Sequence, residues 1–165
     1  MKNSKTQDAQ PDIRLFQGLS KFFSVIPLKP GSKRPFETNW KRYCKARRTF
    51  RRKDFEGGKN AGICCGPASD VLGLDVDNPK VFDALCEANG WEIPETFEVE
   101  TGTGGRHHYF KYPDDGGSYK NRPLDHPIYK RNRIFDIRVT GGMLVAPGSV
   151  HPNGNKYRLK SKKKP

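Results

Sequence analysis

The sequence predicts an α+β fold in which a mostly antiparallel sheet carries helices on one face. Two observations support this. One clear helix signal follows an apolar run at residues 71–76, and after that helix short apolar runs alternate with turn residues. A chain of 165 residues has the length of one domain. We therefore expect a single domain over residues 11–160, with a disordered tail at 1–10 and a basic tail at 161–165.

The first elements are a helix and a strand. Apolar residues recur at helical spacing between Ile13 and Phe23, which predicts one short amphipathic helix. Residues 24–28 follow as a strand, and residues 29–35 form a loop because they are rich in proline, glycine and lysine. The charges of this loop are expected to be exposed.

A basic segment at residues 41–53 comes next, with aromatic residues among its bases. Such a mixture suits nucleic acid, because cations meet phosphates while aromatic rings stack on bases. A solvated helix face anchored to the core by its aromatic residues fits the pattern equally well. The candidate DNA-binding residues are Lys41, Arg42, Arg47, Arg48, Arg51 and Arg52.

The centre of the chain predicts two buried strands and a helix. Apolar runs at 61–65 and 71–76 are bounded by turn residues. The helix after them can be capped by Asp77 or Asn78 and ends at Gly90. A long polar loop interrupts the strands that follow, which are expected at 96–101, 106–112, 134–139, 143–146 and 156–159.

The charge of the chain favours a polyanionic partner. Lys and Arg outnumber Asp and Glu by 31 to 18, for a formal net charge of +13, so nucleic acid is the first candidate. A membrane-surface protein would show an amphipathic helix beside its charges, and the basic segment lacks one. There is no signal peptide, no long apolar run and no CxxC pair, so we expect a cytoplasmic protein without structural zinc.

Two aspartates stand out at the end of the run at 71–76. The two-residue period of a strand sends Asp75 and Asp77 to the same face. Their repulsion calls for a counter-charge, and Mg²⁺ or Mn²⁺ suits carboxylate oxygens. In the simpler alternative Asp75 is an exposed strand residue and Asp77 only a helix cap.

A glycine turn leads into the strand at 106–112. Gly104 and Gly105 would let main-chain N–H groups approach an anion, and His107 on the adjoining strand could reach a phosphate. Strand alternation sets His107 apart from Phe110, which we expect in the core. A plain hairpin would give the same pattern.

Asp136 lies inside an otherwise apolar strand, where an unpaired charge is costly. It can pair with Arg138, which shares its face, or complete a metal site with Asp75 and Asp77. The aspartate pair, the glycine turn with histidine and this isolated aspartate together favour one metal-dependent site over three unrelated features.

The order and spacing of these segments resemble a known family. The matching segments are 25–35, 60–63, 74–77, 104–107, 135–136 and 141–149, spread over residues 22–160. They resemble the bifunctional primase-polymerase domain of the archaeo-eukaryotic primase superfamily, found in replication proteins of plasmids, phages and other mobile elements. The second motif of that family often reads Ser-x-His, whereas this chain has Gly105-Arg106-His107.

The resemblance implies an RRM-like sheet with an additional N-terminal αβ unit. It also implies a nucleotidyltransferase, a DNA primase and polymerase, that joins a dNTP or NTP to a 3′-hydroxyl on a primed DNA template. Two Mg²⁺ or Mn²⁺ ions would be held by Asp75, Asp77 and Asp136, with His107 on the triphosphate. Further candidates for nucleotide binding are Arg106, Gly104, Gly105, Arg138, Lys33, Ser149 and His151.

Such domains are commonly joined to a helicase, so the basic end could begin a linker to a fused one, and a separate helicase is the alternative. Two other functions stay open at this point. One is a DNA-binding or replication-initiation module that has lost turnover, and the other is a metal-dependent nuclease.

Overall fold

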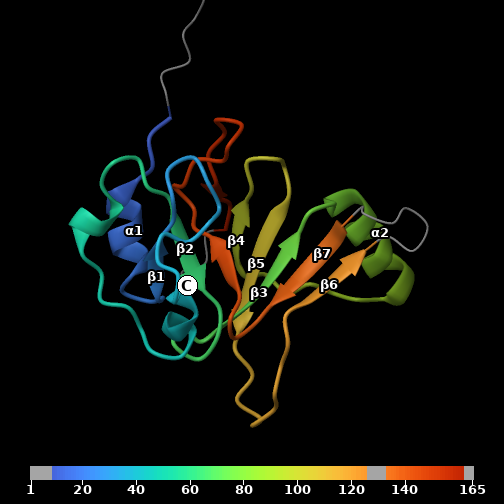
Figure 1. Cartoon of the computed structure of the whole chain (residues 1–165). Helices are drawn as coiled ribbons and strands as arrows, with labels where there is room; N and C mark the ends of the chain where they lie inside the picture. Colours follow the sequence, from blue (N-terminus) through green and yellow to red (C-terminus); the bar gives the residue numbers. More distant parts are fainter. Residues whose placement is uncertain (1–8, 126–132, 162–165) are drawn as a thin grey trace, which may run out of the picture.

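Two antiparallel sheets form the body of the structure, a computed structural model that describes residues 9–125 and 133–161 (Figure 1). One has the strand order β1-β2-β8 and the other β6-β7-β3-β5-β4-β9. The elements are α1 (Ile13–Leu19), β1 (Val25–Pro27), the 3₁₀ helices η1 (Trp40–Cys44) and η2 (Arg52–Phe55), β2 (Ala61–Cys64), β3 (Val71–Val76), α2 (Pro79–Asn89), β4 (Phe97–Glu100), β5 (Arg106–Lys111), β6 (Arg122–Asp125), β7 (Arg133–Arg138), β8 (Met143–Val145) and β9 (Arg158–Leu159). The predicted α+β fold with a mostly antiparallel sheet is confirmed. Most of the expected N-terminal tail, and residues 162–165 of the C-terminal one, lie outside the described residues.

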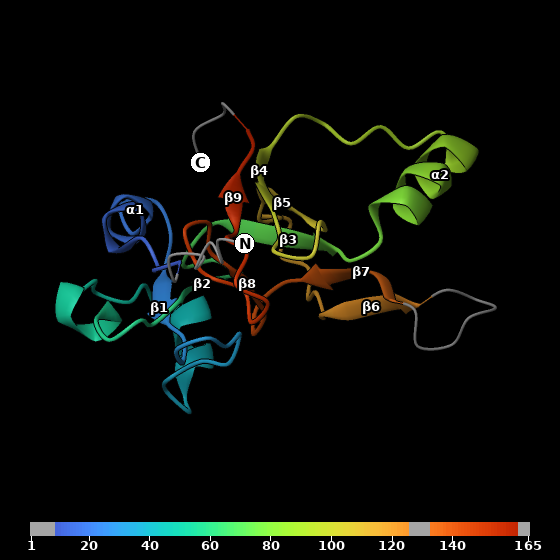
Figure 2. The same ribbon diagram turned by 90° about the horizontal axis from the view of Figure 1, so that it is seen from above.

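Helix α2 follows β3 and packs on one face of the six-stranded sheet (Figure 2). The Asn78 side chain accepts the N–H of Val81, and Gly90 ends the helix with a φ of +63°. Its inner residue Phe82 packs with Leu74 and Val76, which point to this face of β3. Since Asn78 is the cap, the carboxylate of Asp77 is left for other contacts.

The opposite face of β3 lies against β8. A Cβ on Gly73 would come within 2.6 Å of Leu144 Cδ1, so only glycine permits this approach of the two sheets. Leu144 belongs to the larger hydrophobic core, which also holds Val99 and Tyr109 of the six-stranded sheet and Phe16 of α1. The face that carries Gly73 and Asp75 is therefore covered by the three-stranded sheet.

Strand β8 joins residues that are far apart in the sequence. It pairs with β2 through Gly62 and Val145, although it follows β7 of the other sheet along the chain. The N-terminal unit implied by the family resemblance thus contains α1, β1 and β2, and takes its third strand from the C-terminal part.

Part of the segment that was expected to be a long polar loop is strand β6. It pairs with β7 at the edge of the six-stranded sheet, and its four residues are all exposed. Pro123 lies in it, which an edge strand tolerates because one side needs no ladder hydrogen bonds. With no buried face, the segment carries no alternating pattern.

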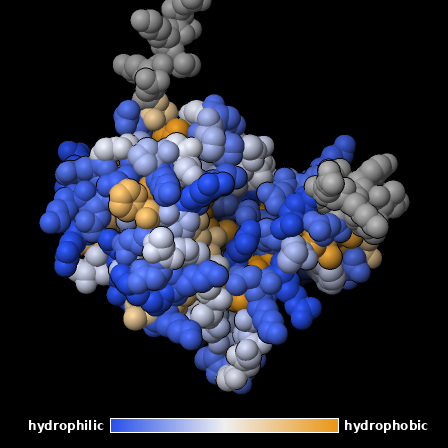
Figure 3. All heavy atoms as spheres, viewed as in Figure 1, coloured by the Kyte–Doolittle hydropathy of each residue, from blue (hydrophilic) through white to orange (hydrophobic). Residues whose placement is uncertain are grey.

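The surface is mainly polar. Hydrophilic side chains cover most of the face shown in Figure 3, with small hydrophobic patches between them. Among the described residues no helix is long and apolar enough to cross a membrane.

Candidate active site

Three of the predicted site residues form a row across adjacent strands. Asp75 of β3 lies directly opposite Asp136 of β7 on one side and His107 of β5 on the other. Side chains of directly opposed residues point to the same face of a sheet. The row therefore lies on the face that β8 covers.

Asp75 is held by cationic and hydrogen-bonding neighbours. His107 Nε2 lies 3.2 Å from Asp75 Oδ1, and the Arg138 guanidinium lies 3.9 Å from Oδ2. Burial acts to raise the pKa of Asp75, but the hydrogen bond and charge of His107, with the charges of Arg138 and Lys33, outweigh it. The pKa of Asp75 thus lies below its ordinary value, and the group is a carboxylate at neutral pH.

The pKa of Asp77 is shifted in the opposite direction to that of Asp75. It follows the last residue of β3, and its N–H donates to the carbonyl of Ile134. Burial and the negative charges of Asp75 and Asp136 raise its pKa. Its carboxylate has no ion-pair partner among the described residues, so it carries the uncompensated charge of the site.

Asp136 is the most deeply placed of the three aspartates, with 5% of its surface exposed. One carboxylate oxygen accepts from Arg133 and the other from Arg138. Arg133 also bonds Asp125 of β6. The predicted pairing of Asp136 with Arg138 is therefore present.

A cavity of about 270 Å³ opens beside this row, between the two sheets. Lys33 reaches it from the connection between β1 and η1, and Trp40 from η1 itself. The polar residues that line it are Lys33, Asp75, Asp77, Thr101, Thr103, His107, Arg138 and Tyr157, and the remainder are Trp40 and residues 141–145.

By its chemistry, the acidic pair fits a divalent cation. Mg²⁺ and Mn²⁺ take oxygen ligands and often use only a few carboxylates beside substrate phosphates. Asp75 and Asp77 line the cavity, and burial together with the charges of Asp75 and Asp136 raises the pKa of Asp77. Within the described residues no three His, Cys, Asp or Glu side chains are placed to hold a metal ion as they stand. Asp136 is not among the residues that line the cavity, and each of its carboxylate oxygens already accepts from an arginine.

The family model for Prim-Pol, described as the N-terminal domain of bifunctional DNA primase/polymerase, matches residues 19–165. This chain belongs to the Prim-Pol family. The family is one of DNA primases and polymerases, which are typically metal-dependent and use DNA and nucleotides as substrates. No curated protein matches the sequence at a significant level.

Some of the nucleotide-binding candidates lie away from the cavity of this Prim-Pol domain. Ser149 is fully buried and exchanges hydrogen bonds with the main chain of Ala61. His151 packs over the Gly102 main chain, and its Nδ1 accepts the N–H of Asn153. Arg106 points to the other face of β5 and bonds Asp83 of α2. The structure gives these three residues contacts within the protein itself.

The glycine turn lies at the edge of the cavity. Gly104 has a φ of +85°, and a Cβ on Gly105 would come within 2.6 Å of the Val76 carbonyl oxygen. The hydroxyl of Thr101 accepts the N–H of Gly105. The turn therefore brings the hydroxyls of Thr101 and Thr103, rather than the glycines themselves, to the cavity wall.

The basic segment divides into supporting and exposed cations. Arg47 donates to the carbonyls of Lys21, Phe22 and Ala68, and half-buried Arg48 bridges Glu37 and Asp54. Arg42 also pairs with Glu37 and lies over the Tyr43 ring. By contrast, Lys41, Arg51 and Arg52 are exposed and have no ion-pair partner among the described residues. The aromatic residues of the segment pack against the core.

Sequence reasoning missed Tyr157 as a cavity residue, and it considered Trp40 only among the aromatic residues of the basic segment. Tyr157 is 2% exposed, packs against the His107 ring and has a raised pKa, first because of burial and then because of the charges of Asp75 and Asp77. Neither residue lies in a segment that carries the aspartates, so no local pattern could have placed them.

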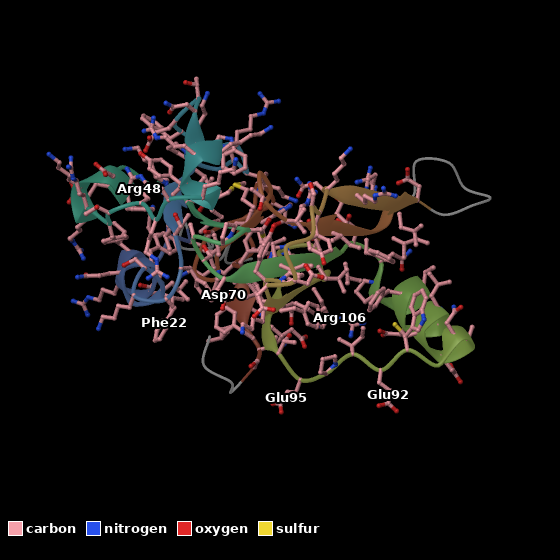
Figure 4. All side chains as sticks on the ribbon, turned by 90° about the horizontal axis from the view of Figure 1, so that it is seen from below. Phe22, Arg48, Asp70, Glu92, Glu95 and Arg106 are labelled. Carbon is pink, nitrogen blue, oxygen red and sulfur yellow. The ribbon has the colours of Figure 1, made fainter. Side chains whose placement is uncertain are left out.

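A larger cavity of about 600 Å³ lies at the opposite end of β3, β4 and β5. Phe22, Asp70 and Glu95, labelled in Figure 4, are among its lining residues. The only predicted site residue in its lining is Arg47, which holds main-chain carbonyls. The site therefore lies with the aspartates, not with the larger volume.

Proposed function

We propose that the cavity beside Asp75 is the active site of a DNA primase/polymerase. The enzyme joins the nucleotide of a dNTP or NTP to a 3′-hydroxyl on a DNA template, in the replication of a plasmid, phage or mobile element. The row of Asp136, Asp75 and His107 beside the cavity carries this proposal. A reducing cytoplasm is the proposed location, which agrees with four buried cysteines that form no disulfide.

Asp75 and Asp77, with Asp136, are the residues that would hold Mg²⁺ or Mn²⁺. When bound, such ions supply Lewis-acid activation of the 3′-hydroxyl and neutralise the α-phosphate and the departing pyrophosphate. His107 donates to Asp75, which keeps this carboxylate ionised and fixes its orientation. The protein thus orients one metal-binding carboxylate, that of Asp75, before a metal ion binds.

The cations around the cavity suit a triphosphate. Lys33 lines it without an ion-pair partner among the described residues, and Arg138 lies within reach of both Asp75 and Asp136. A guanidinium can bind a phosphate in place of a carboxylate, because either group presents two oxygens that its paired N–H groups can reach. We assign triphosphate binding to Lys33, Arg138 and His107.

The exposed cations of the basic segment are assigned to the template. Lys41, Arg51 and Arg52 are free to meet phosphates, while Arg47 and Arg48 hold the segment in place. DNA binding should therefore weaken steeply as salt rises.

Extension of a labelled primer on a DNA template, with Mg²⁺ or Mn²⁺, tests the proposal. The wild type should lengthen the primer, and Asp75→Asn with Asp77→Asn should lower the rate by at least about 100-fold. Asp114→Asn, a change of an exposed aspartate outside the cavity, is the matched control. An unprimed template in parallel shows whether the enzyme also starts chains.

A DNA-binding module without turnover is the second candidate. The arginines on both oxygens of Asp136 favour it, since they compete with a metal for this carboxylate. Tight DNA binding without extension in either metal would establish this function in place of the polymerase. Shortened strands would instead indicate a nuclease.

A further inference from the structure

The cavity is lined by two kinds of residue that come from different elements. The six-stranded sheet contributes charged groups, chiefly Asp75, His107 and Arg138. The other side contributes mainly apolar ones, namely Trp40 of η1 and Met143 of β8 with its neighbours, together with the cation Lys33. A nucleotide has a similar division between a charged triphosphate and a flat base, whose π faces stack on aromatic rings.

We propose that Trp40 is the platform on which the base of the bound nucleotide stacks. This inference rests on the proposed function and names a base subsite within the same cavity. Its ligand is a purine or pyrimidine ring, and the cations assigned to the triphosphate line the same cavity.

The backbone around Trp40 is fixed before any ligand arrives. Cys44, at the other end of η1, is fully buried, and its carbonyl accepts the N–H of Ala68. The Sγ of Cys44 lies 3.5 Å from the Gly142 carbonyl oxygen, next to β8. The backbone of η1, which carries Trp40, is thus anchored beside the cavity, which limits the entropy lost when a base binds there.

The connection that precedes Trp40 also carries Lys33. The side chain of buried Asn60 donates to the carbonyl of Ser32 over 3.2 Å, and Leu28 forms an isolated antiparallel β-bridge with Pro35. One braced segment therefore brings both a cation and an aromatic ring to the cavity. These are the two groups needed to hold a phosphate and a base.

Anchoring of η1 explains only part of the position of Trp40. The ring is partly buried and packs at the margin of the main core, yet it also lines a cavity that contains two carboxylates. Core packing alone gives no reason to leave part of an aromatic ring beside these charges. A base that packs on the ring there would remove this part from water.

Stacking of this kind tolerates every base, because each base presents a π face. Trp40 should therefore add similar affinity for all four dNTPs, while pairing with the template selects among them. The cavity volume of about 270 Å³ is near the lower limit for small-molecule sites, which suits one nucleotide.

Tryptophan fluorescence can report on this subsite directly. The chain has two tryptophans, and Trp91 is 51% exposed on the connection after α2, outside the cavity lining. In a Trp91→Phe protein the emission comes from Trp40 alone. Addition of dATP with Mg²⁺, without DNA, should quench this emission, whereas inorganic tripolyphosphate, which lacks a base, should bind and leave it nearly unchanged.

Trp40→Leu should raise the Kd for each dNTP by about 5- to 150-fold. The Kd for tripolyphosphate should stay within about twofold of wild type, and in primer extension KM should rise with little change in kcat. Trp40→Phe keeps a ring and should lose much less. If Trp40→Leu fails to fold, the quenching measurement and Trp40→Phe still decide.

Absence of quenching, or equal weakening of dATP and tripolyphosphate by Trp40→Leu, would overturn the subsite. The proposed function is judged separately. Loss of extension in the Asp75 and Asp77 variants with unchanged dNTP affinity in Trp40→Leu would keep the polymerase and reject the stacking role. A wild type that neither binds dNTP nor extends a primer would reject both.

Discussion

His107 Nε2 lies 3.2 Å from Asp75 Oδ1, directly across the β3–β5 ladder. This contact contributes to a difference in pKa between Asp75 and its neighbour Asp77. The pKa of Asp75 lies below its ordinary value because its cationic and hydrogen-bonding partners outweigh burial, whereas burial and like charges raise the pKa of Asp77. The two carboxylates should therefore influence folding with opposite signs.

Asp75→Asn should lower the free energy of unfolding at pH 7 by about 1–2 kcal/mol, because a charge-assisted hydrogen bond is lost. A lowered folded-state pKa stabilises the protein above the ordinary aspartate pKa of about 3.9, and this stability is lost as pH falls through the folded-state value. Urea denaturation between pH 7 and pH 3 should show the gap between wild type and variant steady at first, then shrinking below about pH 4. A gap that is independent of pH would contradict the assignment.

Asp77→Asn should have the reverse effect. A raised folded-state pKa means that ionisation of Asp77 opposes folding at pH 7, so the variant should be slightly more stable, by less than about 1 kcal/mol after solvent screening. The gain should disappear below the ordinary aspartate pKa. Thermal melts at pH 7 and pH 3 measure it, and a destabilised variant at pH 7 would show that Asp77 has a favourable partner instead.

Gly73→Ala should cost about 1–3 kcal/mol, because the new Cβ would stand 2.6 Å from Leu144 Cδ1 and force the sheets apart. Chemical denaturation of this variant, of Leu144→Ala and of the double variant should show that the two costs are not additive. Gly18→Ala is the control. No atom lies within 4 Å of its new Cβ, and alanine suits the helix, so stability should rise by about 0.5–1 kcal/mol. Additive costs at Gly73 and Leu144 would count against the close approach.

Arg51→Gln with Arg52→Gln should weaken DNA binding without changing the melting temperature. Each lost phosphate contact should reduce the slope of log affinity against log salt by about 0.7–0.9. Fluorescence anisotropy of labelled DNA at several salt concentrations gives this slope. An unchanged slope would remove these residues from the template surface.

Arg48→Gln is the contrasting variant in the same segment. Its guanidinium bridges Glu37 and Asp54 and is mostly buried, so its loss leaves Asp54 without an ion-pair partner and Glu37 with Arg42 alone. We expect a loss of about 1–3 kcal/mol of stability, with DNA affinity unchanged below the unfolding transition. A normal melting temperature with weakened DNA binding would instead make Arg48 a contact residue.

The sequence alone predicted correctly the elements whose position is determined by local patterns. β3 and α2 lie within about a residue of their predicted positions, because an apolar run, a cap and a terminal glycine act within one segment. The strand period also set Asp75 on the opposite face from Leu74 and His107 on the opposite face from Phe110, and in the structure both of these apolar residues pack on the α2 side. The cross-strand register places Asp75 opposite His107. The family resemblance implied that the two residues share a site, whereas the strand period alone did not.

The remaining features depend on partners that are distant in the sequence. β6 has no buried face and so gave no signal. Ser149 was a nucleotide-binding candidate, but it is buried by its contact with Ala61, 88 residues away. Arg106 shares the glycine-turn motif with His107, yet strand alternation turns it toward Asp83. In each case the tertiary neighbour decides what the side chain does.

The pairing of β2 with β8 has a consequence for the order of folding. Gly62 of β2 pairs with Val145 of β8, so this pairing cannot form until residue 145 has been synthesised. Until then, the edge of β2 that faces away from β1 is unpaired. Closing that long loop late favours slow folding and makes the nascent chain vulnerable to aggregation until residue 145 has emerged. The wall of the cavity made by β8 can form only after residue 145 has emerged, so substrate binding cannot begin before that point.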